Sequence, residues 1–278
     1  MDRRSVESGC PGLIQPERAW AVVGSAWTWI VLVLLVHAAG RIGAVCAPAK
    51  FDSFVYAVAA CRFYDPASTA DDLVPDKPGG QALLTGWSYR LLPGPPTRLT
   101  LIPIESAFLL GGYLLFGLTA TALLGRRMGP FLAFLLALGV NTYNTLDSSV
   151  AGLNVNENYL LLPMVAAAAA HLRVRRPWLR GLLAGLAVGT ALTVKQTAAG
   201  LLAVLLVCDL SRILRPGGQR EGLKAAAGLL IGGLVAWVPL AAFLYARGWW
   251  WPHLDRLMHL TGRHLDWMPP SLPQAYKL

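Results

Sequence analysis

The amino-acid sequence predicts an all-α integral membrane protein that crosses the bilayer about seven times. Of its 278 residues, 55% are hydrophobic and only 14% are charged, and its mean hydropathy is +0.50. Such a chain has too few polar residues to face water on every side. Its apolar residues also lie in long blocks, and a bilayer core of roughly 30 Å requires a helix of about 20 such residues. These observations exclude a soluble globular protein.

Seven apolar blocks are expected to be the membrane spans. They cover residues 19–39, 99–124, 129–145, 159–170, 181–194, 198–210 and 225–245. The first block is longer than the apolar core of a cleaved signal peptide, which has about 7 to 15 residues, so we expect a retained signal anchor. The fourth to sixth blocks are short, which favours helices that end below the membrane surface and line a cavity.

Basic residues predict the orientation of these spans. Arginines and lysines gather in the N-terminal tail and in alternate short connections, around residues 126–127, 173–180 and 212–224. By the positive-inside rule, the tail (residues 1–18) is cytoplasmic and the loop at residues 40–98 is extracytoplasmic. Residues 19–245 then form the transmembrane domain, and residues 246–278 an extracytoplasmic interfacial tail. The net charge of +9 thus comes mainly from basic clusters between apolar blocks, which is typical of a multi-pass protein of the cell membrane. We expect membrane lipids as partners and no nucleic acid.

The four cysteines carry little functional information. None of them forms a CxxC pair, so the sequence does not predict a zinc or thioredoxin-like site. Cys46 and Cys61 share the outer loop, where they either form a disulfide or stay as thiols.

The outer loop is the most acidic part of the chain. It holds five of the fifteen carboxylates, namely Asp52, Asp65, Asp71, Asp72 and Asp76. Asp52 precedes an apolar segment at residues 53–63, which we expect to form a juxtamembrane helix lying on the membrane interface. A turn rich in proline and glycine then leads to a second apolar stretch at residues 81–92.

Three motifs resemble those of one enzyme class. They are Asp52-Ser-Phe-Val-Tyr56, the turn Asp76-Lys77-Pro78-Gly79-Gly80, and Asn156-Glu157-Asn158 together with Lys195-Gln196-Thr197. With the signal anchor and the long outer loop, they resemble the GT-C class of membrane glycosyltransferases. This class includes protein O-mannosyltransferases and lipid A aminoarabinose transferases, which use polyprenyl-phosphate sugars. The sequence departs from the class at Gly79, where the acidic-Lys-Pro-Pro turn has its second proline.

The resemblance implies a site on the extracytoplasmic face. A sugar would move from a polyprenyl-phosphate donor to a lipid or protein acceptor, which needs a base for the acceptor and a cation for the leaving phosphate. Asp52 would be the catalytic base, and Lys77 and Lys195 would bind the donor phosphate. The supporting residues would be Asp71, Asp72, Asp76 and Glu157. If a divalent cation takes part, oxygen ligands such as Asp71 and Asp72 favour Mg²⁺ or Mn²⁺.

Each of these residues also has a simpler interpretation. Asp52 and Glu157 are alternatively helix caps, Lys77 is a solvated turn residue or a lipid-headgroup contact, and Lys195 snorkels outward to the membrane surface. Asp71 and Asp72 alternatively belong to a solvated, mobile loop. Glu105 near the outer end of the second span is either functional or reaches the membrane surface.

Two alternatives concern the whole chain. One is a transporter or flippase-like carrier. The other is a truncated, non-catalytic membrane protein, because members of the GT-C class usually have more spans. The Trp249–Trp251 run after the last span is typical of an interfacial belt.

Overall fold

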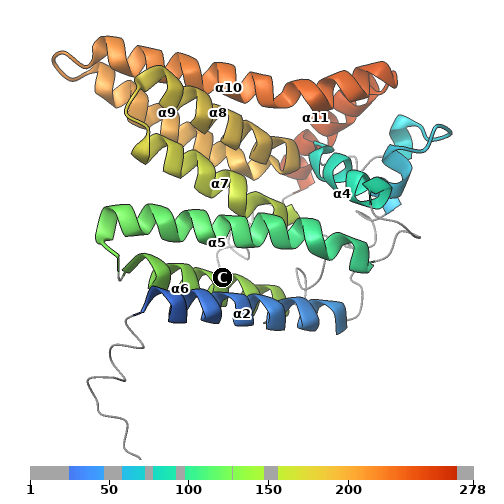
Figure 1. The fold of residues 1–278 in the computed structure, drawn as a ribbon. Coiled ribbons are helices and arrows are strands. Elements are labelled where there is room, and N and C mark those ends of the chain that lie inside the picture. Colours follow the sequence, from blue (N-terminus) through green and yellow to red (C-terminus); the bar gives the residue numbers. More distant parts are fainter. Residues whose placement is uncertain are drawn as a thin grey trace, which may run out of the picture.

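The computed structural model describes residues 25–46, 58–72, 78–91, 98–126, 128–146 and 156–267. All regular structure in these segments is helical, which confirms the predicted all-α class. The long helices that lie along the bundle are α2 (Ala26–Cys46), α5 (Ile102–Leu124), α6 (Met128–Leu146), α7 (Asn156–Arg173), α8 (Pro177–Val194), α9 (Ala199–Ile213) and α10 (Gln219–Ala246). Successive members of this series run in opposite directions along one axis (Figure 1).

Five helical segments of the described chain are long and apolar enough to cross a membrane. They are α2, α5, α8, α10 and the segment Gln196–Ile213, which joins the short helix η3 (Gln196–Ala198) to α9. The apolar part of α6, Met128–Thr142, is shorter. Helix α7 carries polar residues at both ends, including Glu157 and Arg173. The structure thus supports a multi-pass membrane protein, while the sixth and seventh spans stay a prediction.

The helices pack as a chain of neighbours in the order α2, α6, α5, α7, α8, α10 and α9. The closest contact joins α8 to α10 through glycines spaced four residues apart, a pattern that lets helix backbones approach each other in membranes. A Cβ atom at Gly181, Gly185 or Gly189 would lie 2.0, 2.2 or 2.7 Å from a backbone carbonyl oxygen of α10. These distances leave no room for a side chain at any of these three positions.

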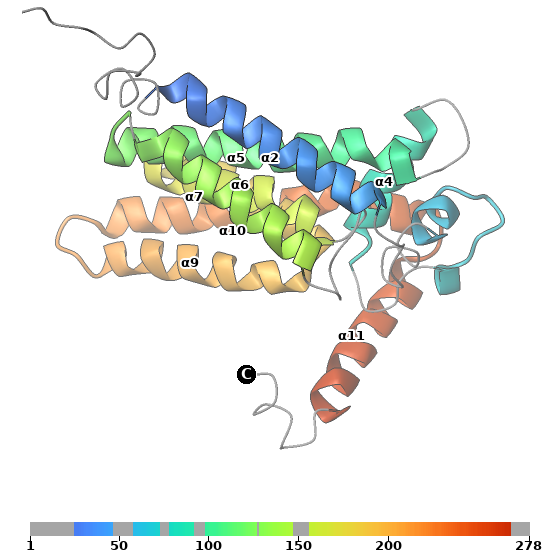
Figure 2. The ribbon, with the colours of Figure 1, turned by 90° about the horizontal axis from the view of Figure 1, so that it is seen from below.

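Short helices form a layer over one end of the bundle: residues 58–63, η1 (Ala70–Asp72) and α4 (Gly80–Leu91). Helix α11 (Trp250–Trp267) starts at the same end and projects away from the bundle (Figure 2). The fully buried Phe63 stacks on Phe243 of α10 with ring centroids 4.5 Å apart, and Trp249 meets both rings edge-on. This aromatic cluster attaches the layer to the end of α10.

One span ends later than the sequence predicts. Helix α2 continues to Cys46, seven residues beyond the predicted end at residue 39, because Arg41 is buried within it instead of starting a loop. The predicted tail at residues 246–278 contains helix α11, which packs against η1 and α10. Its location at the membrane interface stays a prediction. Residues 58–63 agree with the end of the predicted helix at 53–63, whose start lies outside the described residues.

The cysteines that the structure describes, Cys46, Cys61 and Cys208, are free thiols, so the alternative of a Cys46–Cys61 disulfide is not supported.

Candidate functional site

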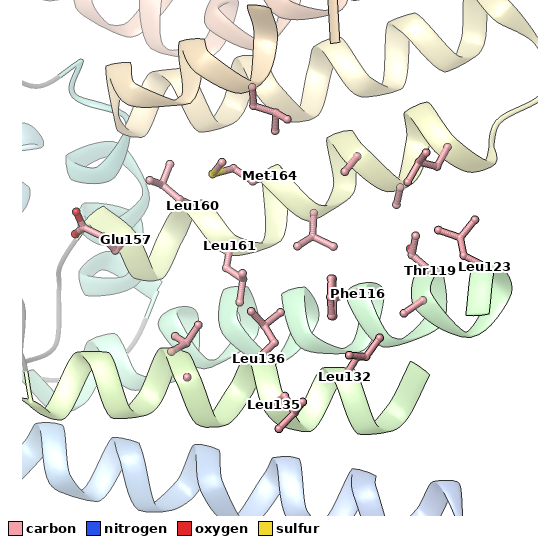
Figure 3. Close-up of a pocket in the computed structure, with 18 of the residues that line it drawn as sticks. Phe116, Thr119, Leu123, Leu132, Leu135, Leu136, Glu157, Leu160, Leu161 and Met164 are labelled. Carbon is pink, nitrogen blue, oxygen red and sulfur yellow. The ribbon is translucent and has the colours of Figure 1, made fainter. Parts of the chain in front are cut away.

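A large apolar groove runs along α5 between α6 and α7. Its volume is about 880 Å³, and its lining comes from α5, α6, α7 and Leu201 of α9. Figure 3 shows the side chains that face it, including Phe116, Leu123, Leu132, Leu136, Leu161 and Met164. Along α7 the lining extends from Glu157 to Leu172, which at 1.5 Å per residue is about 22 Å. The groove is therefore long enough to cover most of a bilayer core of roughly 30 Å.

One end of the groove carries a charged pair. Glu157 lies at this end in Figure 3, and its carboxylate forms an ion pair with the Lys195 ammonium group. Glu157 belongs to the first turn of α7, and Lys195 directly follows the last residue of α8. The two helices are neighbours, so their ends bring these residues together. The side chains are 35% and 26% exposed, respectively. Glu157 lines the groove, and both side chains of the pair are partly open to solvent at this end.

The described end of the Asp-Lys-Pro turn lies beside this pair. A Cβ atom at Gly80 would lie 2.5 Å from the carbonyl oxygen of Thr193, two residues before Lys195. The carbonyl oxygen of Pro78 is 3.2 Å from Nε2 of the buried His253 on α11. Residues 78–80 are thus held between α8 and α11, although these segments are far apart in the sequence.

The backbone conformation at Gly79 explains why this position is not a proline. Gly79 has a φ of 95°, whereas proline is fixed near −65°. We expect Gly79→Pro to destabilise the protein by about 3 kcal/mol or more, and Gly79→Ala to destabilise it by about 1–2 kcal/mol. Thermal unfolding in detergent, with Gly79→Asn as the better tolerated control, checks this order. Equal stability of wild type and Gly79→Pro would contradict it.

A buried ion pair lies at the same end of the bundle, between α2 and α5. The guanidinium group of Arg41 donates from Nη1 to Oε2 of Glu105 at 3.0 Å, with side chains 6% and 0% exposed. The fully buried Tyr159 of α7 is close to Glu105. Glu105 is therefore paired inside the protein and does not reach the surface.

Tyr89 on α4, in the layer of short helices, is also partly buried. Burial, with Cys61 and Glu105 nearby, raises the pKa of Tyr89 above its usual value.

Several predicted site residues lie where the structure gives no description. Asp52, Asp76 and Lys77 are outside the described residues, so their roles stay predictions. Asp72 is described only through its backbone, as the last residue of η1. The exposed Asp71 forms an ion pair with Arg256 of α11. Of the predicted set, the described chain brings together Glu157 and Lys195.

Asp71, one of the two predicted cation ligands, is already paired with an arginine in the structure. The guanidinium group of Arg256 neutralises Asp71 and also donates from Nη1 to the carbonyl oxygen of Ala70 at 2.9 Å. Over the described segments, no three His, Cys, Asp or Glu side chains are grouped as metal ligands would be. The need for Mg²⁺ or Mn²⁺ stays a prediction.

A second buried charged cluster, which the sequence pattern did not predict, lies at the opposite end of the bundle. The carboxylate of Asp209 on α9, with 0% side-chain exposure, accepts hydrogen bonds from Arg180 of α8 and Arg212. The sequence does contain a signal for this cluster, because Asp209 lies among apolar residues at the end of the sixth block. An ionisable residue inside a span usually has a charged or polar partner.

Comparisons with known proteins returned no match, whether with protein families, with curated proteins or with solved structures.

Proposed function

We propose that this protein is a membrane glycosyltransferase that transfers a sugar from a polyprenyl-phosphate donor to a lipid or protein acceptor on the extracytoplasmic face. The observation that supports it best is the 880 Å³ apolar groove with the Glu157–Lys195 pair at one end. A polyprenyl phosphate is divided in the same way as the groove, because it has a long apolar chain and a charged phosphate at one end.

In this proposal, Lys195 holds the donor phosphate. An ammonium group has three N–H donors, so Lys195 can bind a phosphate oxygen while keeping its contact with Glu157. Its positive charge stabilises the negative charge that develops on the phosphate as the bond to the sugar breaks. Lys77 supplies a second cation, and Asp52 is the base that takes the proton of the acceptor hydroxyl.

The proposed topology has seven spans and a cytoplasmic N-terminus. The end of α5, the α7–α8 connection and the α9–α10 connection lie at one end of the bundle, and the α8–α9 connection and the start of α4 lie at the other (Figures 1 and 2). Arginines follow or occupy each of the first three positions. The positive-inside rule then supports a cell-membrane protein whose groove mouth faces outward.

Transfer of a labelled sugar tests the proposal. Membranes containing the protein receive a radiolabelled polyprenyl-phosphate sugar, and transfer to endogenous lipid and protein acceptors is counted. We expect Asp52→Asn, Lys77→Ala and Lys195→Met each to lower transfer at least about 100-fold, the scale of one general-base or electrostatic contribution. Lys224→Met, an exposed lysine in the first part of α10, is the matched control and should transfer at the wild-type rate. No transfer by wild type, or equal transfer by all variants, would overturn the enzyme proposal.

A carrier for lipid-linked or anionic substrates is the second candidate. The buried charged groups Glu105 and Asp209 favour it, because ionisable groups inside membrane proteins often mark transport pathways. The two candidates differ in chemistry. In the same assay, a carrier would move the labelled donor across sealed vesicles without transferring its sugar.

A further inference from the structure

Two connections at the end of the bundle opposite Lys195 carry a strongly basic surface. The exposed cations are Arg173, Arg175 and Arg176 around the α7–α8 connection and Arg215, Arg220 and Lys224 around the α9–α10 connection. Within residues 173–176 and 214–224, the sequence has a single carboxylate, Glu221. We call these six residues the basic surface. Its charge is largely uncompensated by the chain itself.

A buried cluster holds the two connections next to each other. Nη2 of Arg180, in the first turn of α8, donates to Oδ1 of Asp209 at 3.4 Å. Nη1 of Arg212, in the last turn of α9, donates to the same oxygen at 2.7 Å. On the other side, Nδ1 of His171 near the end of α7 lies 3.8 Å from Oδ2 of Asp209. Because the cluster joins the ends of α7 and α9 to the start of α8, the six cations form one surface.

Large apolar side chains are exposed between these cations. Leu172 precedes Arg173, Trp178 follows the α7–α8 connection, and Leu214 precedes Arg215, with exposures of 58%, 43% and 87%. Leu223, next to Lys224, is 64% exposed. Cations mixed with exposed leucine and tryptophan match the boundary between lipid headgroups and acyl chains. A surface for nucleic acid or an acidic protein would not need the leucines.

We propose that the basic surface binds the anionic headgroups of bilayer lipids, with the flanking apolar side chains in contact with their acyl chains. Binding here is independent of the proposed transferase activity, which lies at the other end of the bundle. Each basic residue near an anionic membrane surface contributes about a fivefold increase in affinity at ordinary ionic strength. The Debye length falls from about 8 Å at 0.15 M salt to about 3 Å at 1 M, so the interaction should weaken with salt.

Lipid retention by the full chain tests this proposal. The protein in a neutral maltoside detergent is titrated with phosphatidylglycerol or phosphatidylcholine, and bound lipid is counted by native mass spectrometry. We expect wild type to prefer phosphatidylglycerol at least about tenfold at low salt. Neutralising Arg175, Arg176, Arg215 and Arg220 to glutamine should abolish this preference, and the matching lysine variant should keep it. A variant with Arg62→Gln and Arg90→Gln, both exposed at the opposite end, is the control and should resemble wild type.

The outcomes separate lipid from other sources of negative charge. Equal binding of both lipids by wild type, an unchanged preference in the glutamine variant, or an equal loss in the control would overturn the proposal. Displacement of phosphatidylglycerol by millimolar inorganic phosphate, or tighter binding of a polynucleotide, would also overturn it. If the glutamine variant does not fold, the salt dependence of wild type decides, because a salt-independent preference contradicts an electrostatic headgroup site.

Discussion

Gly185→Ala should strongly destabilise the protein by forcing α8 and α10 apart. The new Cβ atom would lie 2.2 Å from the carbonyl oxygen of Leu229 and 2.9 Å from the amide nitrogen of Gly233. Both contacts are with backbone, which cannot move aside as a side chain can, so α8 and α10 must separate. We expect a loss of about 3 kcal/mol, the upper part of the usual range for overpacking.

The measurement is thermal unfolding in detergent, followed by tryptophan fluorescence. For a chain of this size, a loss of about 3 kcal/mol lowers the midpoint by roughly 10 °C. Gly200→Ala is the matched control, since a Cβ atom there meets nothing within 4 Å. Alanine is the better helix former by about 1 kcal/mol, so the control should be as stable as wild type or slightly more stable. A Gly185→Ala protein as stable as Gly200→Ala would show that the two helices do not pack as described.

Glu105→Leu should cost about 3–5 kcal/mol, because it leaves the buried Arg41 guanidinium group without its partner. The two side chains are 3.0 Å apart and at most 6% exposed, so water cannot replace the lost carboxylate. The same unfolding measurement should place Glu105→Leu among the least stable variants.

The double variant Arg41→Met, Glu105→Leu provides the control. Replacing both members of a buried ion pair with apolar residues is often neutral or stabilising, so it should recover most of the stability lost in Glu105→Leu. Destabilisations that simply add in the double variant would mean that the two residues do not interact.

The sequence predicted the helices well where local apolar pattern decides them. The predicted block at 129–145 differs from α6 by one residue at each end, and the block at 225–245 lies within α10. It failed at the end of α2, because Arg41 in isolation reads as the start of a loop. Its partner Glu105 is 64 residues away, and hydropathy reports only on near neighbours in the chain.

The candidate site shows the same limit. Glu157 and Lys195 were predicted as separate site residues, but their pairing depends on how the ends of α7 and α8 meet across 38 residues of sequence. The groove was expected only as an unspecified cavity among the short spans. Its walls come from side chains on α5, α6 and α7, and no single segment carries that information.

The groove offers the most direct test of the proposed donor site. Gly139 lines it, and a Cβ atom at this position meets nothing within 4 Å, so Gly139→Phe should fill the groove without disturbing the helices. Gly200→Phe adds the same side chain at an equally open position that is not part of the groove lining.

The decisive measurement is equilibrium binding of a radiolabelled polyprenyl phosphate to the two variants and to wild type in lipid nanodiscs. We expect Gly139→Phe to lower the affinity at least about tenfold, because losing the burial of only two prenyl-chain methylenes already costs about 1.6 kcal/mol. Gly200→Phe should bind as wild type does. Unchanged affinity in Gly139→Phe, with both variants folded, would contradict the assignment of the groove to the donor lipid.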